Sequence, residues 1–231
     1  MTTGDEAKAR ELLANAKALL LDFDGPICSV FAGLPASTVA EQLRVVLADG
    51  GHTELPESVA TTGDPFDVFR YAATLGHDEA RYVEAAFTAL EVEAITTATP
   101  TPGAHDLIHA WCKTGRPLAI VSNNSAAAIS VYLDLYSLKA AINTVSARRA
   151  SDVTLLKPAP YLIFEAARRL NTAAIDCLLI GDSVTDAEAA RSAGGRIIGF
   201  ANKPYKRAQL RQAQADTTAE NMTSLARIGS R

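Results

Sequence analysis

The sequence predicts an α/β protein with a doubly wound parallel sheet and a small all-helical insertion after the first strand. Two observations predict it. Five short runs rich in Val, Ile and Leu are separated by segments with helical patterns. Near-continuous apolar runs are typical of strands that are buried on both faces, as in a parallel sheet. Residues 30–97 interrupt this rhythm with helical segments alone.

The five strand-like runs and the helices between them follow the chain in order. The runs are ALLLDFDG (18–25), PLAIVSNN from Pro117, INTVSA from Ile142, CLLIGDS from Cys177 and GRIIGF from Gly195. Helical patterns cover 5–17, 103–114, 125–135, 159–170 and 184–193. Such alternation favours a Rossmann-like core with right-handed crossovers.

The stretch between residues 30 and 97 is expected to form a separate helical domain. Helical segments are predicted at 37–48, 65–75 and 78–95, with a short one near 56–60. The run TATPTPG at 97–103 is expected to lead the chain back. We therefore predict an α/β core from residues 1–29 and 98–231, with the helical domain at 30–97. The polar, basic tail from Asn202 is expected to end in one or two surface helices.

The amino-acid composition limits the classes of partner that the protein can be expected to bind. The 231-residue chain is 48% hydrophobic and 21% charged, which is ordinary for a globular protein, and its net charge is −4. This balance argues against nucleic-acid binding, which needs a basic surface. No apolar run approaches the roughly 20 residues that span a bilayer. Three cysteines without a Cys-x-x-Cys pair and no secretory pattern at the N-terminus lead us to expect a cytoplasmic protein with free thiols.

Polar and charged side chains gather where the predicted strands end. In open α/β sheets, ligands bind outside the carboxyl ends of the strands. If the sheet is parallel, the strand ends and the connection before residue 159 bring together one set of residues: Asp22, Asp24 and Gly25; Ser122 and Asn123; Lys157; Asp182 and Asp186. The sequence therefore predicts a single polar pocket at this edge.

Four carboxylates in one pocket indicate a divalent cation. Like charges a few ångströms apart repel one another, and a hard cation relieves that repulsion. Mg²⁺ prefers oxygen ligands and usually takes one or two carboxylates together with a substrate phosphate. Asp22 and Asp182 are the expected direct ligands. Asp24 could add its backbone carbonyl, and Asp186 could hold a metal-bound water or support the other ligands.

The Asp22-Phe23-Asp24 spacing suits phosphoryl transfer. Residues two apart in extended backbone point to the same side, so both carboxylates can address one phosphoryl group. Asp22 could attack phosphorus, and Asp24 could protonate the leaving alcohol and then activate water. Gly25 would let the backbone approach and offer its N–H to the phosphate.

Lys157 and the Ser122-Asn123 pair fit the same chemistry. Lys157 precedes a proline and lies near a helix N-terminus, where a positive charge is unfavourable. Neutralising a phosphate or the Asp22 carboxylate would explain its position. The Ser122 hydroxyl and the Asn123 N–H could donate to phosphate oxygens, because phosphoryl transfer depends on positioning and charge neutralisation.

The ordered motifs DFDGP, SNN, KP and GDSVTD resemble those of the haloacid dehalogenase superfamily, specifically its phosphatase branch. The resemblance covers about residues 18–200. It implies that Asp22 is the nucleophile, Asp24 the general acid/base, Ser122 a phosphate ligand and Lys157 the group that stabilises the intermediate. It also implies that Asp182 and Asp186 bind magnesium, and that the helical domain corresponds to the family's cap.

Pro26 departs from the family, which most often has Thr after this glycine, so the loop can differ in detail. Asp24 argues against carbon–halogen cleavage, because the dehalogenases proper lack that aspartate. The expected function is hydrolysis of a small phosphorylated metabolite. The alternatives are a phosphomutase of the β-phosphoglucomutase type, which would use the same Asp22 and Asp24, a receiver-like signalling module and a binding protein. The sequence does not indicate an oligomeric state.

Overall fold

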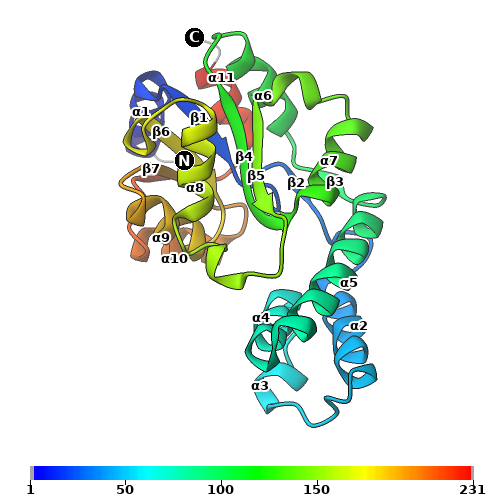
Figure 1. Ribbon diagram of the computed structural model, residues 1–231. Coiled ribbons are helices and arrows are strands. Elements are labelled where there is room, and N and C mark those ends of the chain that lie inside the picture. Colours follow the sequence, from blue (N-terminus) through cyan, green and yellow to red (C-terminus); the bar gives the residue numbers. More distant parts are fainter. Residues whose placement is uncertain (1–2, 230–231) are drawn as a thin grey trace.

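A six-stranded parallel sheet forms the centre of the larger part of the molecule in this computed structural model, which describes residues 3–229 (Figure 1). Its strand order is β5-β4-β1-β6-β7-β8, and every neighbouring pair is parallel. The strands are β1 (Ala18–Leu21), β4 (Leu118–Ser125), β5 (Thr144–Arg148), β6 (Cys177–Gly181), β7 (Arg196–Phe200) and β8 (Thr217–Ala219). The doubly wound α/β class predicted from the sequence is confirmed.

Helices cover both faces of the sheet, because the central strands place apolar side chains on each face. Leu19 and Leu21 of β1 join one hydrophobic cluster, whereas Ala18 and Leu20 join another. The first cluster includes α1 (Thr3–Asn15), α6 (Ala104–Cys112), α7 (Ala126–Leu135) and α11 (Met222–Gly229). The second includes α8 (Tyr161–Arg169) and α9 (Val184–Ser192), and α10 (Pro204–Gln212) packs beside α9. Short 3₁₀ turns lie at Lys139–Ala141, Val153–Leu155 and Ala174–Asp176.

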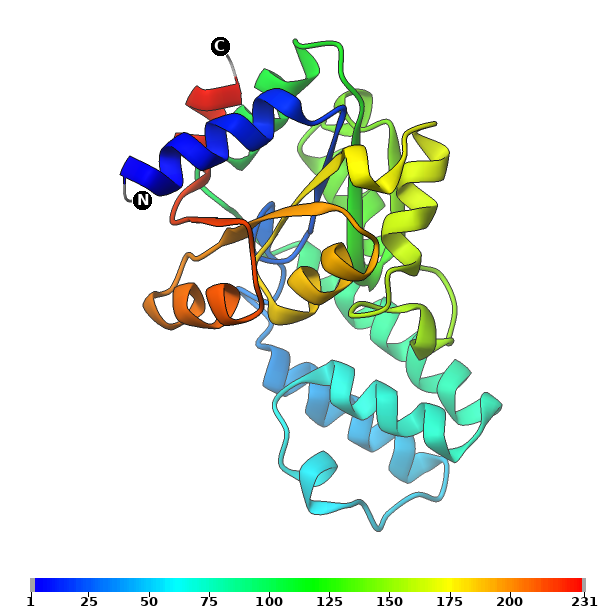
Figure 2. The same cartoon turned by 90° about the vertical axis from the view of Figure 1, so that its left-hand side faces the viewer.

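Residues between β1 and α6 form a helical insert that projects from the sheet (Figures 1 and 2). It consists of α2 (Ala36–Asp49), α3 (Glu57–Ala60), α4 (Pro65–Leu75) and α5 (His77–Ile95), which share their own hydrophobic cluster. Leu156, the residue before Lys157, belongs to this cluster. The insert therefore packs directly against the segment that carries the predicted catalytic lysine.

The chain leaves for the insert and returns from it through a two-stranded antiparallel ladder, which was not predicted. It joins β2 (Cys28–Ser29) to β3 (Thr99–Pro100). The side chain of Thr101 also donates to the Gly25 carbonyl at 2.6 Å. The return segment is thus fastened to the loop that follows β1.

The C-terminal part differs from the expectation of surface helices alone. Thr217–Ala219 form β8, a buried edge strand beside β7, and α11 packs against α1 and α6 with Met222 and Leu225 buried. Tertiary pairing with β7 makes this short polar segment a strand. The three cysteines are free thiols, as expected. None of the described helices is long and apolar enough to cross a membrane.

Candidate active site

Asp22 lies directly after β1 and is almost completely buried. Its N–H donates to the Ile180 carbonyl at 2.9 Å, so the backbone still follows β6 at this point. Its Oδ1 atom accepts the Phe23 N–H at 2.7 Å and lies 2.8 Å from Lys157 Nζ. Phe23 points into the core, where its ring meets Tyr132 edge-on. Alternation along the extended backbone thus buries Phe23 and turns Asp22 towards the strand ends.

Lys157 joins three parts of the site. Its ammonium group lies 2.8 Å from Asp22 Oδ1 and 2.5 Å from Asp186 Oδ1, and it donates to the Val121 carbonyl at 3.1 Å. Burial by itself lowers the pKa of Lys157, but the adjacent carboxylates of Asp186 and Asp22 outweigh this and raise it. Lys157 is therefore a permanent cation beside Asp22, where the sequence argument expected one.

Asp186 organises the loop after β6. Its Oδ2 atom accepts the backbone N–H groups of Asp182 and Ser183, both at 3.1 Å, and the Ser183 hydroxyl at 2.6 Å. Ser183 in turn accepts the Asp186 N–H, which completes a capping box at the start of α9. Through these donors and Lys157, Asp186 holds the loop after β6 in place.

The carboxylates of Asp22, Asp182 and Asp186 form a cluster that could hold a metal ion. One ligand oxygen from each lies within 4.8 Å of the others. Burial, followed by the Asp186 charge, raises the pKa of Asp22 to about 7, and burial raises the pKa of Asp182 to about 6. Hard oxygen donors whose ionised forms are disfavoured by burial fit Mg²⁺, which would stabilise the ionised forms.

The segment after β4 is held from two sides. Asn123 pairs with the backbone of Lys157, donating to its carbonyl at 3.1 Å and accepting its N–H at 2.8 Å. Ser122 is buried and donates to Asn124 Oδ1 at 3.1 Å. Asn124 donates to Glu91 Oε1 at 2.9 Å. Since a carboxylate only accepts, this contact fixes the orientation of the Asn124 amide and links Ser122 to the helical insert.

Glu91 and Arg148 form a buried ion pair between insert and sheet that the sequence did not indicate. Glu91, on α5, accepts from Arg148 Nη2 and from the Ser125 N–H. The Arg148 guanidinium also lies 4.3 Å from the centre of the Phe87 ring, which belongs to the insert's hydrophobic cluster.

Asp24 and Gly25 occupy the turn after Asp22. Asp24 Oδ1 accepts the Val30 N–H at 2.9 Å, and burial raises the pKa of Asp24 to about 6. The Asp24 carboxylate is not part of the three-carboxylate cluster found among the described residues. A carboxyl that keeps its proton up to about pH 6 suits a general acid.

In the structure the Gly25 N–H donates to the Cys28 carbonyl at 2.7 Å, and the donation to a phosphate that the sequence predicts stays a prediction. The structure gives another reason for glycine here. Its φ is +102°, and a Cβ atom would lie 2.2 Å from Asp182 Oδ2. Gly25 therefore allows the loop after β1 to pack closely against the Asp182 carboxylate.

Lys206 is a further charged residue at this edge. It lies in the first turn of α10, and its ammonium group pairs with Asp182 Oδ2. The signal was present in the sequence. A lysine in a helical first turn without acidic neighbours is unfavourable, which is the argument that singled out Lys157.

Three charged residues near the start of α4 in the helical insert have partners within the insert. Asp64 caps α4 by accepting the Phe66 N–H, and Asp67 pairs with Arg70 at 3.1 Å. These contacts account for the three charged residues without a ligand.

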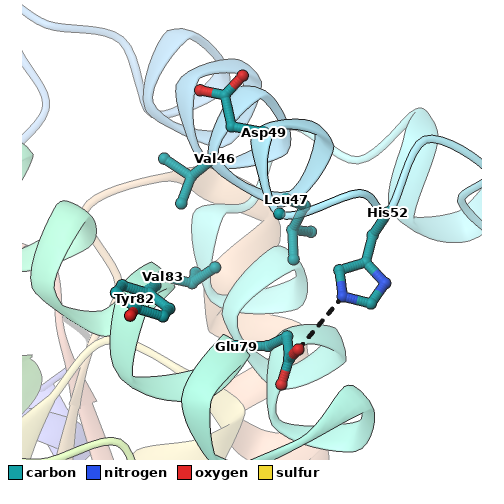
Figure 3. Close-up of a pocket in the computed structure, with 8 residues that line it drawn as sticks. Val46, Leu47, Asp49, His52, Glu79, Tyr82 and Val83 are labelled. Carbon is teal, nitrogen blue, oxygen red and sulfur yellow. Dashed lines mark hydrogen bonds and ion pairs between the residues drawn. The ribbon is translucent and has the colours of Figure 1, made fainter.

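A separate hollow of about 380 Å³ lies on the insert (Figure 3). Its walls come from the end of α2, the following turn and the start of α5, and His52 lies 3.4 Å from Glu79 across it. The lining residues are Val46, Leu47, Asp49, Gly50, His52, Glu79, Tyr82 and Val83. The hollow thus contains none of the motif residues at the strand ends.

Comparison with known proteins finds relatives that are described as phosphatases or hydrolases. The chain is 35% identical over 105 residues to the bifunctional riboflavin kinase/FMN phosphatase of Arabidopsis thaliana, covering 45% of this chain and 27% of that protein. The crystal structure of a hydrolase from Pseudomonas syringae superposes with a TM-score of 0.68 at 20% identity, covering 90% of this chain and 95% of that one. A HAD family hydrolase from Deinococcus radiodurans R1, solved with bound phosphate and sodium, has a TM-score of 0.59 at 27% identity, covering 94% and 98%.

A family model places the chain more firmly than any single relative. The model for haloacid dehalogenase-like hydrolases matches residues 16–194, a range that begins before β1 and ends after α9. It contains Asp22, Ser122, Lys157 and Asp182, together with the whole helical insert. The chain therefore belongs to the haloacid dehalogenase-like hydrolase family.

Proposed function

We propose that this protein is a magnesium-dependent phosphatase that hydrolyses a small phosphate monoester through an aspartyl-phosphate on Asp22. The observation that carries the proposal is the contact of Lys157 with both Asp22 and Asp186, beside Asp182. A carboxylate held next to a permanent cation and a group of further carboxylates suits attack on a phosphoryl group. The FMN phosphatase named among the relatives and the relative solved with phosphate support the same chemistry.

In the first step, an Asp22 oxygen attacks phosphorus and the bond from phosphorus to the ester oxygen breaks. The proton of Asp24 passes to the departing oxygen, so the alcohol leaves neutral. In the second step, ionised Asp24 takes a proton from a water molecule whose oxygen attacks phosphorus. The bond from phosphorus to Asp22 then breaks, which releases inorganic phosphate and restores both carboxyl groups to their starting states.

Other residues hold the phosphoryl group and its charge. Lys157 neutralises the charge that develops beside Asp22. The Ser122 hydroxyl and the Asn123 N–H donate to phosphoryl oxygens, and the side chain of Asn123 keeps this segment aligned with Lys157 through its paired backbone contacts. Ser122 must turn its hydroxyl from Asn124 towards the phosphate when substrate binds.

Asp22 and Asp182 would hold the magnesium ion directly, the Asp24 carbonyl would complete its protein ligands, and Asp186 would hold the loop that presents Asp182. The bound ion supplies charge neutralisation for the phosphoryl oxygens. We propose that the helical insert, residues 30–97, acts as a cap that closes over the site and excludes bulk water. A cap admits small phosphorylated metabolites and excludes bulky substrates. We expect the protein to act in the cytoplasm without nucleic-acid or membrane partners.

Phosphate release from a panel of phosphorylated metabolites tests the proposal. We expect release that requires magnesium and is lost in Asp22→Asn, whereas Asp134→Asn keeps it. Asp134 is exposed and pairs with Lys139, so it is a matched control for the same substitution. Absence of release by folded wild-type protein across the panel would contradict the proposal. Transfer of the phosphoryl group to a sugar hydroxyl instead would favour a phosphomutase.

A further inference from the structure

Lys206 brings a second ammonium group to the carboxylate cluster. It comes from α10, and its side chain and that of Asp182 are 17% and 12% exposed. Lys206 therefore contacts Asp182, whereas Lys157 contacts both Asp22 and Asp186.

Lys157 and Lys206 differ in how firmly their ammonium groups are held. Lys157 is almost fully buried and has three contacts, so it is fixed. Lys206 has a flexible stem and pairs with one carboxylate among the described residues, which allows it to exchange that partner for another anion.

The first turn of α10 distinguishes Lys206 from its cationic neighbours. This turn contains no acidic residue, so a positive charge there is opposed by the helix dipole. Arg207 pairs with Asp5 of α1 and with Glu220, away from the site. Lys203 is exposed at the N-cap position. Of these three cations, Lys206 is the one that contacts a carboxylate of the cluster.

We propose that Lys206 is a second cationic substrate-binding residue, which competes with the metal ion for the Asp182 carboxylate and then contacts the anionic phosphate of the bound substrate. This inference rests on the proposed phosphatase function. Its consequence is that Lys206 has opposite effects on the two ligands. Its charge opposes metal binding through repulsion and competition, and it favours phosphate binding through attraction.

Calorimetric titration of Mg²⁺, and of inorganic phosphate at saturating Mg²⁺, tests this inference without turnover. For Lys206→Met we expect Mg²⁺ to bind about tenfold more tightly and phosphate about tenfold more weakly. Lys206→Arg keeps the charge and should resemble wild type. Lys203→Met, three residues earlier, should change neither affinity more than about twofold, because exposed charges are screened.

Affinities that fall together in Lys206→Met, or that match those of Lys203→Met, would overturn the inference. If Lys206→Met lacks the thermal transition of wild type, Lys206→Gln replaces it, since its amide can still donate to Asp182. Opposite shifts in a protein that hydrolyses no ester would support Lys206 and contradict the phosphatase proposal. If the protein hydrolyses an ester but Lys206→Met leaves both affinities unchanged, the phosphatase proposal is supported and the role of Lys206 is contradicted. A wild type that binds neither Mg²⁺ nor phosphate would contradict the phosphatase proposal and the role of Lys206.

Discussion

Glu91→Gln removes the charge that compensates a fully buried guanidinium. The side chains of Glu91 and Arg148 are both 0% exposed. Within the described part of the chain, Arg148 Nε and Nη1 have no hydrogen-bond partner, and the second acid, Glu84, lies 3.8 Å away. Glutamine keeps the size of Glu91 and one acceptor oxygen. The change therefore leaves the packing nearly intact, and it removes the buried charge together with one of the two acceptor oxygens that Asn124, Ser125 and Arg148 now use.

The expected loss follows from this burial. Removing one partner of a buried ion pair costs about 3–5 kcal/mol, because the other charge stays desolvated. For a domain of this size, each kcal/mol lowers the melting temperature by about 2–4 °C, so we expect a decrease of about 6–20 °C. Glu84→Gln is the matched control. It faces the same Arg148 from the same helix but is partly exposed, so its loss should stay below about 1 kcal/mol.

Urea unfolding of wild type and both variants measures these free energies. We expect the midpoint of Glu91→Gln to fall with an unchanged slope, since the surface exposed on unfolding is the same. A loss within about 1 kcal/mol of that in Glu84→Gln would refute the reasoning, because Arg148 would then be compensated elsewhere.

Two further predictions concern the carboxylate cluster. Burial raises the pKa of Asp22 to about 7 and that of Asp182 to about 6. Between about pH 4 and 7 the metal-free folded protein therefore binds more protons than the unfolded chain. Its free energy of unfolding should fall as pH rises through that window. Thermal unfolding with Mg²⁺ and with a chelator should show a larger gain from Mg²⁺ at about pH 8 than at about pH 5, and equal gains would contradict this. Gly25→Ala should weaken Mg²⁺ binding in calorimetry, because its Cβ atom would displace Asp182. Gly51→Ala, at φ +90° with no atom within 4 Å of its Cβ, carries similar backbone strain and should leave Mg²⁺ binding unchanged, so equal weakening in both variants would count against the Asp182 contact.

The sequence predicted those features that depend on local pattern and on the direction of parallel strands. Asp22, Ser122 and Asp182 follow buried apolar runs, and parallel pairing of β1, β4 and β6 brings those ends to one edge. Lys157 was found because a lysine before a proline near a helix start needs an electrostatic reason. The helices of the insert were predicted within a few residues because Gly50, Gly51 and Gly76 separate them.

What escaped prediction depends on pairing between distant segments. Thr217–Ala219 are short and polar, and they form a strand because β7 offers an unpaired edge. From its local pattern Glu91 resembles a solvated helix residue, but in the fold it is buried against Arg148, which lies 57 positions later in the chain. The hydrogen bond from Gly25 N–H to Cys28 likewise depends on how the loop turns after Pro26. A residue's partner across the fold is not encoded in its local pattern.

The central claim is that Asp22 carries the phosphoryl group, and mass spectrometry of an acid-quenched reaction tests it most directly. The Asp24→Asn variant with p-nitrophenyl phosphate is the suitable system, since the activated leaving group needs no general acid while the second step loses its base. We expect the peptide that contains Asp22 to gain the mass of one phosphoryl group, and to lose this gain in Asp22→Asn/Asp24→Asn. Unmodified peptide despite continued release of p-nitrophenol, or a phosphoryl group on another residue, would contradict the account.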